Sequence, residues 1–218
     1  MKEKGSVTQI RHNADGQYEI AFVHRDLTPL AALLKHWQPK IHAFYTDLIA
    51  DLMEHDPSLK PADVDTAFAA MTFNFGPNAA TYEHMDHQNY AAGFCVVTSL
   101  GDYDASRGGH LFLRELGLVV EFPVGASILL PSAVIAHGNT SIGKNEYRAS
   151  VTSYTAAGNV RWRDQLYKVQ DNMTAAEKRT FRALQMPRRT AAVERLSKID
   201  ELGEDQKQFS LRTPRGAP

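Results

Sequence analysis

The stretch from Met71 to Thr155 alternates short β-prone runs with glycine, proline and asparagine, and this texture limits the fold more than any other feature. The runs cover residues 72–75, 81–86, 93–100, 110–113, 118–122, 127–130, 134–137 and 147–155. Several short strands separated by turn formers predict a sandwich or a barrel. Two segments, 96–97 and 128–130, are apolar at successive positions, which is typical of strands covered on both faces.

Helical patterns flank this β-prone stretch on both sides. Before it, residues 6–10 and 17–24 favour a strand pair around Asp15-Gly16, because glycine tolerates the positive φ of a tight turn. Thr28-Pro29 then predicts a helix start, and apolar spacing continues to about residue 54 across Pro39, so we expect a kink or two helices. Residues 61–70 favour one more helix.

A second helical region follows residue 162. Thr174 and Glu177 have the spacing of a capping box, which predicts a helix start there. Pro187 is expected to end that helix, and residues 190–202 favour another. We therefore predict an α+β chain with a mainly β core, folded as one unit. Its expected parts are a hairpin with supporting helices (1–70), the β core (71–160), C-terminal helices (161–208) and a flexible tail (209–218).

Composition excludes several classes of protein. The net charge of −1 gives no general electrostatic case for binding nucleic acid or a membrane, and the single cysteine, Cys95, excludes a disulfide within the chain. We also expect no disulfide-linked partner. The apolar run 126–136 is too short to cross a bilayer, and the first residues lack the apolar core of a signal peptide. We expect an intracellular protein, cytoplasmic or nuclear.

One local departure from this balance is the segment 174–198. It carries seven basic side chains against two acidic ones, Glu177 and Glu194. The basic ones are Lys178, Arg179, Arg182, Arg188, Arg189, Arg195 and Lys198. A solvated helix face is the favoured interpretation, and binding of nucleic-acid phosphates is the alternative.

Candidate metal ligands lie in and beyond the segment 82–89. Residues two apart on a strand share a face, so His84 and Asp86 are expected to project together while His87 points away or lies in a loop. A third ligand has to come from elsewhere, and His137 ends a β-like run. Two histidines and one carboxylate form the facial triad of non-haem Fe(II) oxygenases, which leaves the opposite face of the metal open.

A candidate anchor for a second ligand follows that third histidine. On a strand, Arg148 and Ser150 share a face, and a guanidinium can hold a carboxylate through two parallel hydrogen bonds. A small dicarboxylate that chelates the metal at one end needs such an anchor at the other. The alternative for Arg148 is a surface ion pair with Glu146.

Motifs between residues 72 and 162 resemble those of Fe(II)/2-oxoglutarate-dependent dioxygenases, most closely the fungal group related to the TET and JBP oxygenases. They are 72–77 (TFNFGP), 84–89 (HMDHQN), 97–104 (VTSLGDYD), 108–111 (GGHL), 121–125 (EFPVG), 129–133 (LLPSA), 137–140 (HGNT) and 148–150 (RAS). The resemblance implies a double-stranded β-helix, or jelly roll, flanked by helices. It also implies Fe(II) held by His84, Asp86 and His137, with O2 as the oxidant and 2-oxoglutarate as a cosubstrate on Arg148 and Ser150.

The same resemblance suggests substrate contacts. In TET-like enzymes an asparagine at the place of Asn89 holds a flipped base, and an aromatic residue at the spacing of Tyr154 stacks on it. The chain departs from the animal members by having Ala156 where they have a base-contacting histidine, which argues against 5-methylcytosine. The alternatives are a turn role for Asn89 and a packing role for Tyr154.

Three functions follow from these patterns. The first is a dioxygenase that oxidises a C–H bond of a small molecule or amino-acid-like compound and releases succinate and CO2. The second is oxidation of a methylated nucleobase in DNA or RNA. The third is a non-catalytic jelly-roll binding domain.

Overall fold

The computed structural model describes residues 8–12, 18–22, 28–59 and 67–210. The two N-terminal strands, β1 (Thr8–His12) and β2 (Tyr18–Phe22), pair antiparallel, as the sequence predicted. The expected turn at Asp15-Gly16 lies outside the described residues. The helix predicted over residues 61–70 also falls largely outside them, and its described end is not helical because Ala70 already begins a strand.

Two helices, α1 (Thr28–Trp37) and α2 (Pro39–His55), meet at Gln38. Pro39 is the first residue of α2, a position whose missing N–H has no helical partner in any case. The Gln38 side chain accepts from the Ser197 N–H at 2.9 Å and donates to the Ser197 carbonyl at 3.3 Å. The proline break is therefore confirmed as two separate helices, and their junction is bound to the C-terminal part of the chain.

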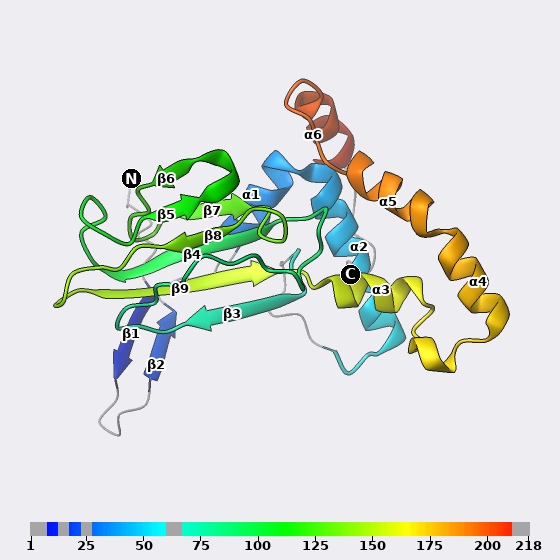
Figure 1. Ribbon diagram of the computed structural model, residues 1–218, viewed down its shortest axis with the longest axis horizontal. Coiled ribbons are helices and arrows are strands. Elements are labelled where there is room, and N and C mark those ends of the chain that lie inside the picture. Colours follow the sequence, from blue (N-terminus) through cyan, green and yellow to red (C-terminus); the bar gives the residue numbers. More distant parts are fainter. Residues whose placement is uncertain (1–7, 13–17, 23–27, 60–66, 211–218) are drawn as a thin grey trace.

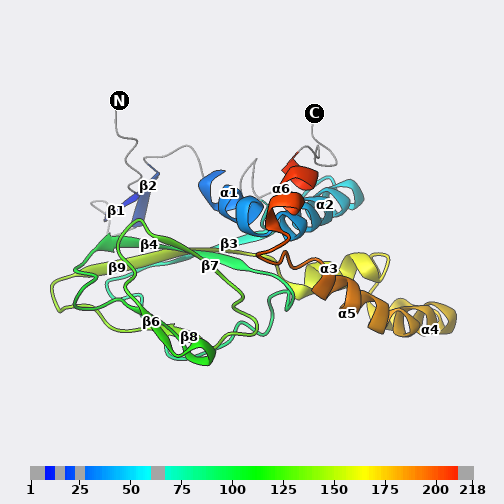
Figure 2. The ribbon, with the colours of Figure 1, turned by 90° about the horizontal axis from the view of Figure 1, so that it is seen from above.

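Two antiparallel sheets form the β core. The larger has the order β3-β9-β4-β7, and the smaller has the order β6-β5-β8. Their strands are β3 (Ala70–Asn74), β9 (Tyr147–Tyr154), β4 (Cys95–Asp102), β7 (Ser127–Leu130), β6 (Leu118–Val120), β5 (Leu111–Leu113) and β8 (His137–Asn139). Figure 2 shows α1 and α2 on one side of the larger sheet and the smaller sheet on the other side. The expected mixture of helices with antiparallel sheets is confirmed.

Strand alternation separates the two faces of the larger sheet. On β9, Ala149 and Val151 pack in an apolar cluster with Leu100, whereas Ser150 and Thr152 line a cavity between the sheets. A further apolar cluster, containing Cys95 and Leu111, lies partly between the same sheets. The helices cover the outer face through a third cluster that includes Leu34, Leu48 and Val96. The space between the sheets is thus filled by apolar side chains in one part and holds a cavity with a mixed polar and apolar lining in another.

Two predicted strands differ in the structure. Residues 81–86 form no strand, and only His84 makes an isolated bridge, to His137. The strand predicted over 134–137 is displaced to His137–Asn139, because the N–H groups of Val134 and Ile135 both donate to the Pro131 carbonyl and close a turn. Local β propensity could not reveal either outcome, since both depend on which partners the backbone finds.

The C-terminal region is helical, as expected, with different bounds. Its elements are α3 (Ala157–Asp164), α4 (Ala175–Ala183), α5 (Gln185–Glu194) and α6 (Leu202–Ser210), with short 3-10 turns at Gln170–Asn172 and, in the β core, at Arg114–Leu116. Pro187 lies in the first turn of α5, where proline is tolerated, and does not end α4. The helix predicted over 190–202 is corrected to α5 and α6. In Figure 1, α4 and α5 extend away from the sheets as a helical arm.

The capping box at the start of α4 is confirmed. The Glu177 N–H donates to Thr174 Oγ1 at 3.2 Å, and the Thr174 N–H donates to Glu177 Oε2 at 2.7 Å. The pKa of Glu177 is lowered to about 2, first by its hydrogen bond with Lys168 and then by those with Thr174. No helix among the described ranges is long and apolar enough to cross a membrane.

Replacing Thr174 by alanine is expected to fray the start of α4. Losing an N-cap hydroxyl costs a helix about 1 kcal/mol, and α4 has no buried residue to offset that loss. Faster amide exchange over the first turn of α4 is the expected result. Thr190→Ala, inside α5, is the matched control. Equal exchange in both variants would contradict the role given to the cap.

Candidate metal centre

The structure brings His84, Asp86 and His137 together. The backbones of the two histidines exchange hydrogen bonds, with the His84 N–H donating to the His137 carbonyl at 3.0 Å and the reverse bond at 2.9 Å. Their ring centroids are 4.4 Å apart, and His84 Nε2 lies 3.6 Å from Asp86 Oδ1. One ligand atom from each of the three residues lies within 4.8 Å of the others. That spacing fits one shared cation.

Both histidine rings have one nitrogen committed to the backbone. His84 Nδ1 lies 2.9 Å from the Tyr82 carbonyl oxygen, and His137 Nδ1 lies 2.8 Å from that of Ile135. A carbonyl oxygen only accepts, so each Nδ1 carries the hydrogen and each Nε2 keeps its lone pair. This is how proteins orient a metal-binding imidazole. Two imidazole nitrogens and one carboxylate oxygen are a donor set that suits Fe(II).

A strap of residues 77–90 carries two of the three ligands across the protein. Its backbone hydrogen bonds join it in turn to β9, to β8, to the turn after β7 and to the end of β9. The bonded pairs are Pro77–Arg148, Ala79–Arg148, Thr81–Asn139, His84–His137, Asp86–Ser132 and Tyr90–Thr155. The alternation argument therefore grouped His84 with Asp86 correctly, although the strap is not a sheet strand.

His87 lies in a turn of the strap, exposed, and outside the metal-competent group found among the described residues. It still lines the same cavity. Replacing His87 by alanine is expected to leave metal affinity within roughly twofold, since surface substitutions usually change free energies by about 0.5 kcal/mol or less. Titration calorimetry with Mn²⁺ measures this, with His84→Ala as the variant expected to lose binding. A large loss for His87→Ala would place it among the ligands.

The triad borders a cavity of about 1050 Å³ between the two sheets. Its wall includes Thr72 and Asn74 from β3 and Ser150, Thr152 and Tyr154 from β9. His137 is 6% exposed, whereas the His84 side chain is 41% exposed. The triad therefore faces a cavity with a mixed polar and apolar lining, and His84 is reachable from solvent.

Arg148 is buried at 1% exposure on the same face of β9 as Ser150. Its Nη1 donates to the Ala79 carbonyl, while Nε and Nη2 are buried without a hydrogen-bond partner. A buried guanidinium with unused donors is costly unless an anion satisfies it. The sequence alternative of a surface ion pair with Glu146 is wrong, since Glu146 hydrogen-bonds instead to the N–H groups of Gly143 and Asp104.

Arg148 itself does not line the cavity, but its neighbours do. Ser150, 6% exposed, accepts from Asn74 Nδ2 at 3.1 Å, and Asn74, Asn78 and Ala79 are all cavity residues. Ser150 thus lies at the wall of the cavity, and the Arg148 guanidinium is buried beside a wall residue, Ala79, to whose carbonyl it donates. Asn74 joins this group without a local sequence signal, because its contact spans the β3–β9 pairing.

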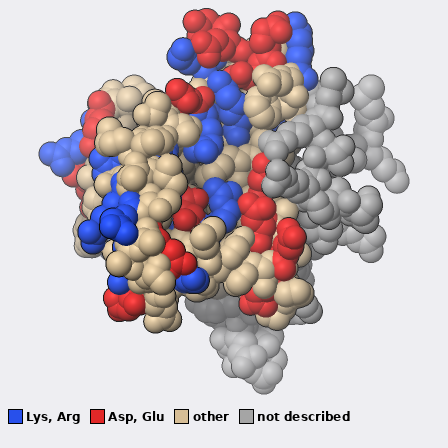
Figure 3. Space-filling view, turned by 90° about the vertical axis from the view of Figure 1, so that its right-hand side faces the viewer, with Lys and Arg blue, Asp and Glu red and all other residues tan. Residues whose placement is uncertain are grey.

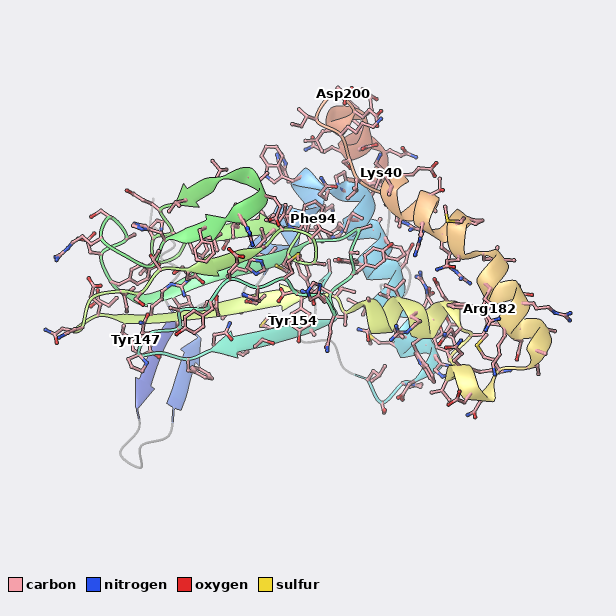
Figure 4. All side chains as sticks on the ribbon, in the orientation of Figure 1. Lys40, Phe94, Tyr147, Tyr154, Arg182 and Asp200 are labelled. Atoms are coloured by element: carbon pink, nitrogen blue, oxygen red, sulfur yellow. The ribbon has the colours of Figure 1, made fainter. Side chains whose placement is uncertain are left out.

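Asn89 and Tyr154, the two expected substrate contacts, both line the cavity. Asn89 Nδ2 lies 3.1 Å from Asp86 Oδ2 and 3.1 Å from Ser132 Oγ. The Tyr154 hydroxyl accepts from Thr72 Oγ1 at 3.4 Å, and its ring also packs against the cluster around Cys95. Figure 4 shows Tyr154 and Tyr147 at opposite ends of β9.

Cys95 lies close to the triad without joining it. Burial raises the pKa of its thiol to about 12, a hydrogen bond with Ser132 opposes that shift, and the charge of Asp86 adds to it. Cys95 is not part of the group of residues that could share a metal ion among the described residues.

Comparisons with known proteins add a partial likeness in structure. The sequence matches no protein-family model and no curated protein. NgTET1 in complex with 5mC DNA superposes with a TM-score of 0.40 at 15% identity, over 73% of this chain and 62% of that one. The viral collagen prolyl hydroxylase vCPH from Paramecium Bursaria Chlorella virus-1, in its 2OG complex, gives 0.29 at 14% identity, over 39% and 60%. This chain spans less than two thirds of either, and at these TM-scores only its own side chains can define the chemistry.

Proposed function

We propose that this protein is a non-haem Fe(II)/2-oxoglutarate-dependent dioxygenase. In the overall reaction, 2-oxoglutarate and O2 are consumed, one oxygen atom enters the succinate formed with release of CO2, and the other hydroxylates a C–H bond of the substrate. Fe(II) would be held by His84, Asp86 and His137 and would supply the oxidation chemistry when bound. The side chains of this chain hold the reactants and exclude water.

The observation that carries this proposal is the buried Arg148 guanidinium beside the triad's cavity. A triad alone suits several metals and reactions. The two unpartnered N–H donors of Arg148 add a site for a carboxylate, since a guanidinium binds carboxylate oxygens in parallel. A dicarboxylic 2-oxo acid has a chelating end for the metal and a second carboxylate for Arg148 and Ser150.

The proposed fold is a double-stranded β-helix, formed by the facing sheets of four and three strands. In this proposal residues 71–160 are the catalytic core, and the flanking regions 1–70 and 161–208 support it. The helices on the outer face of the larger sheet leave the inner face free for the cavity.

The substrate proposed is a small molecule or an amino-acid-like compound. The cavity of about 1050 Å³ lies near the upper end of the roughly 300–1,000 Å³ typical of small-molecule sites, which suits ligands of that size. Asn89 and Tyr154 are the proposed contacts, because both line this cavity. With both hydrogens of its amide nitrogen engaged, Asn89 would meet a substrate through its carbonyl oxygen.

Oxidation of a methylated nucleobase is a second candidate, favoured by the helical arm. Arg188 pairs with Asp164, Arg195 lies over the Phe44 ring, and Lys198 pairs with Glu201. Of the seven basic side chains in the segment 174–198, five have no ion-pair partner among the described residues: Lys178, Arg179, Arg182, Arg189 and Arg195. Figure 3 shows acidic atoms scattered among the basic ones on this side, and Figure 4 places Arg182 well away from Tyr154. The small-molecule proposal therefore ranks first.

Succinate release tests the proposed activity. With Fe(II), O2 and 2-oxoglutarate, the protein is expected to release succinate slowly without substrate and faster with the right one. DNA retention that weakens steeply with salt would favour the nucleobase substrate. If 2-oxoglutarate binds without turnover across a broad substrate screen, the chain is a jelly-roll binding domain.

A further inference from the structure

We infer that Asn89 positions the metal ligand Asp86 and holds it to coordination through a single oxygen. This inference rests on the proposed function, which it deepens. The Asp86 carboxylate has its two oxygens in different surroundings. Oδ1 lies 3.6 Å from His84 Nε2, toward the triad, whereas Oδ2 lies 3.1 Å from Asn89 Nδ2. One oxygen faces the metal position and the other is bound to protein.

The direction of this hydrogen bond is fixed by chemistry. An ionised carboxylate only accepts, so the atom facing Asp86 Oδ2 has to be the amide nitrogen of Asn89. The second hydrogen of that nitrogen points at Ser132 Oγ, also at 3.1 Å. Both hydrogens are therefore used within the protein, and rotating the amide by half a turn would place its oxygen against the carboxylate, which cannot donate.

Asn89 is itself held on a rigid base. Its N–H donates to the Asp86 carbonyl at 2.9 Å, and it forms a bridge with Ala156. On either side of it, the Tyr90 N–H donates to Thr155 and the Ala157 N–H donates to Gln88. The end of β9 thus fixes the backbone that carries the amide.

Ser132 completes the arrangement from the other side. It is 1% exposed, and its carbonyl accepts the Asp86 N–H at 2.9 Å while its hydroxyl meets Asn89. The backbone and the side chain of Asp86 are therefore both fixed through Ser132 and Asn89. The contacts of Ser132 with Asp86 and Asn89 span over forty positions in the sequence, so the spacing of the His-x-Asp pair could not reveal them.

Single-oxygen coordination matters for the proposed reaction. A facial triad leaves the opposite face of the metal for ligands. A 2-oxo acid chelates through two atoms, and O2 needs one more position. If Asp86 supplied both oxygens, it would occupy one of these positions, and the 2-oxo acid and O2 could not both bind. By hydrogen-bonding Oδ2, Asn89 would leave the metal face opposite the triad free for the 2-oxo acid and O2.

The test replaces Asn89 by leucine, which has nearly the same shape and no N–H group. Mn²⁺ affinity of the full chain, measured by titration calorimetry, is expected to fall roughly 10–100-fold, as it does when residues that hold a metal ligand are lost. At saturating Mn²⁺, 2-oxoglutarate affinity is expected to fall as well, since Asp86 is free to turn. A role in folding alone would lower the melting temperature without changing the second affinity.

Gln88→Leu is the matched control. Gln88 is a neighbouring amide that lines the same cavity, is exposed and has no described side-chain bond to Asp86. It is expected to bind Mn²⁺ and 2-oxoglutarate as the unaltered protein does. Ser132→Ala, which leaves the Asn89–Asp86 bond in place, is expected to weaken Mn²⁺ binding less than Asn89→Leu and decides the matter if the latter fails to fold.

The inference is overturned if Asn89→Leu binds Mn²⁺ and 2-oxoglutarate as tightly as Gln88→Leu does. If Asn89→Leu does not fold, the inference is overturned when Ser132→Ala folds and binds Mn²⁺ as tightly as the unaltered protein. The proposed function fails separately if the unaltered protein binds Mn²⁺ but neither binds nor consumes 2-oxoglutarate. In that case the difference in metal affinity between the variants still decides the role of Asn89.

Discussion

Replacing Asp86 by alanine is expected to abolish metal binding and iron-dependent succinate release. Asp86 supplies the only carboxylate of the metal-competent group among the described residues. Its loss leaves two imidazoles, neutral ligands that hold a divalent cation without offsetting its charge. The loss of affinity is expected to exceed the roughly 10–100-fold typical for residues that only hold a ligand. Calorimetry with Mn²⁺ and a succinate assay with Fe(II) measure the two effects.

Glu83→Ala is the matched control for Asp86→Ala. It removes the same charge from the same strap, but Glu83 is paired with Arg114 on the surface. Exposed ion pairs contribute little, so both assays are expected to stay close to the unaltered protein. If Asp86→Ala turns over at the rate of the unaltered protein, the catalytic metal binds at another site.

Replacing Arg148 by methionine is expected to raise the 2-oxoglutarate concentration needed for turnover at least tenfold while leaving Mn²⁺ affinity nearly unchanged. Each hydrogen bond to a charged partner contributes about 1.5–3 kcal/mol, and about 1.4 kcal/mol corresponds to tenfold in affinity. Methionine fills much of the same volume. Because Nε and Nη2 have no partner in the protein alone, the variant is expected to be at least as heat-stable.

Arg114→Met is the control for Arg148→Met, since it removes an exposed arginine from the surface near the strap. Arg148 is supported as the 2-oxoglutarate anchor if Arg148→Met changes the 2-oxoglutarate dependence without changing metal binding. Arg114→Met should change neither. If Arg148→Met keeps its 2-oxoglutarate dependence, the carboxylate is bound elsewhere. If it loses the metal as well, Arg148 supports the fold of the site and not the cosubstrate.

The parts of the fold that local chemistry decides were predictable from the sequence. Pro39 divides two helices because it cannot donate the bond that a continuous helix needs, and Thr174 with Glu177 starts α4 because their side chains satisfy free N–H groups. The grouping of His84 with Asp86 was also predictable. The two side chains, two positions apart, meet in the triad although the strap belongs to no sheet strand.

The remainder depends on contacts between distant segments. Residues 134–137 have β propensity, yet Pro131 accepts two N–H groups and turns the chain before β8 can begin. The α6 helix has no strong start signal, and its position is set partly by Lys40, which pairs with Asp205 at 3.0 Å. The bond from Asn89 to Asp86 is local, but its meaning depends on Ser132 and on the end of β9. Periodicity and spacing carry none of this information.

The strap of residues 77–90 has a consequence for how a metal ion would act on the whole protein. It is joined to strands of both sheets, and the triad unites it with β8. An ion bound there would work as a cross-link between layers, and any opening that separates the sheets would release it. Binding of that kind stabilises in proportion to RT ln(1 + [metal]/Kd). If an ion forms this cross-link, adding metal is expected to slow amide exchange in β8 and in the strap by the same factor.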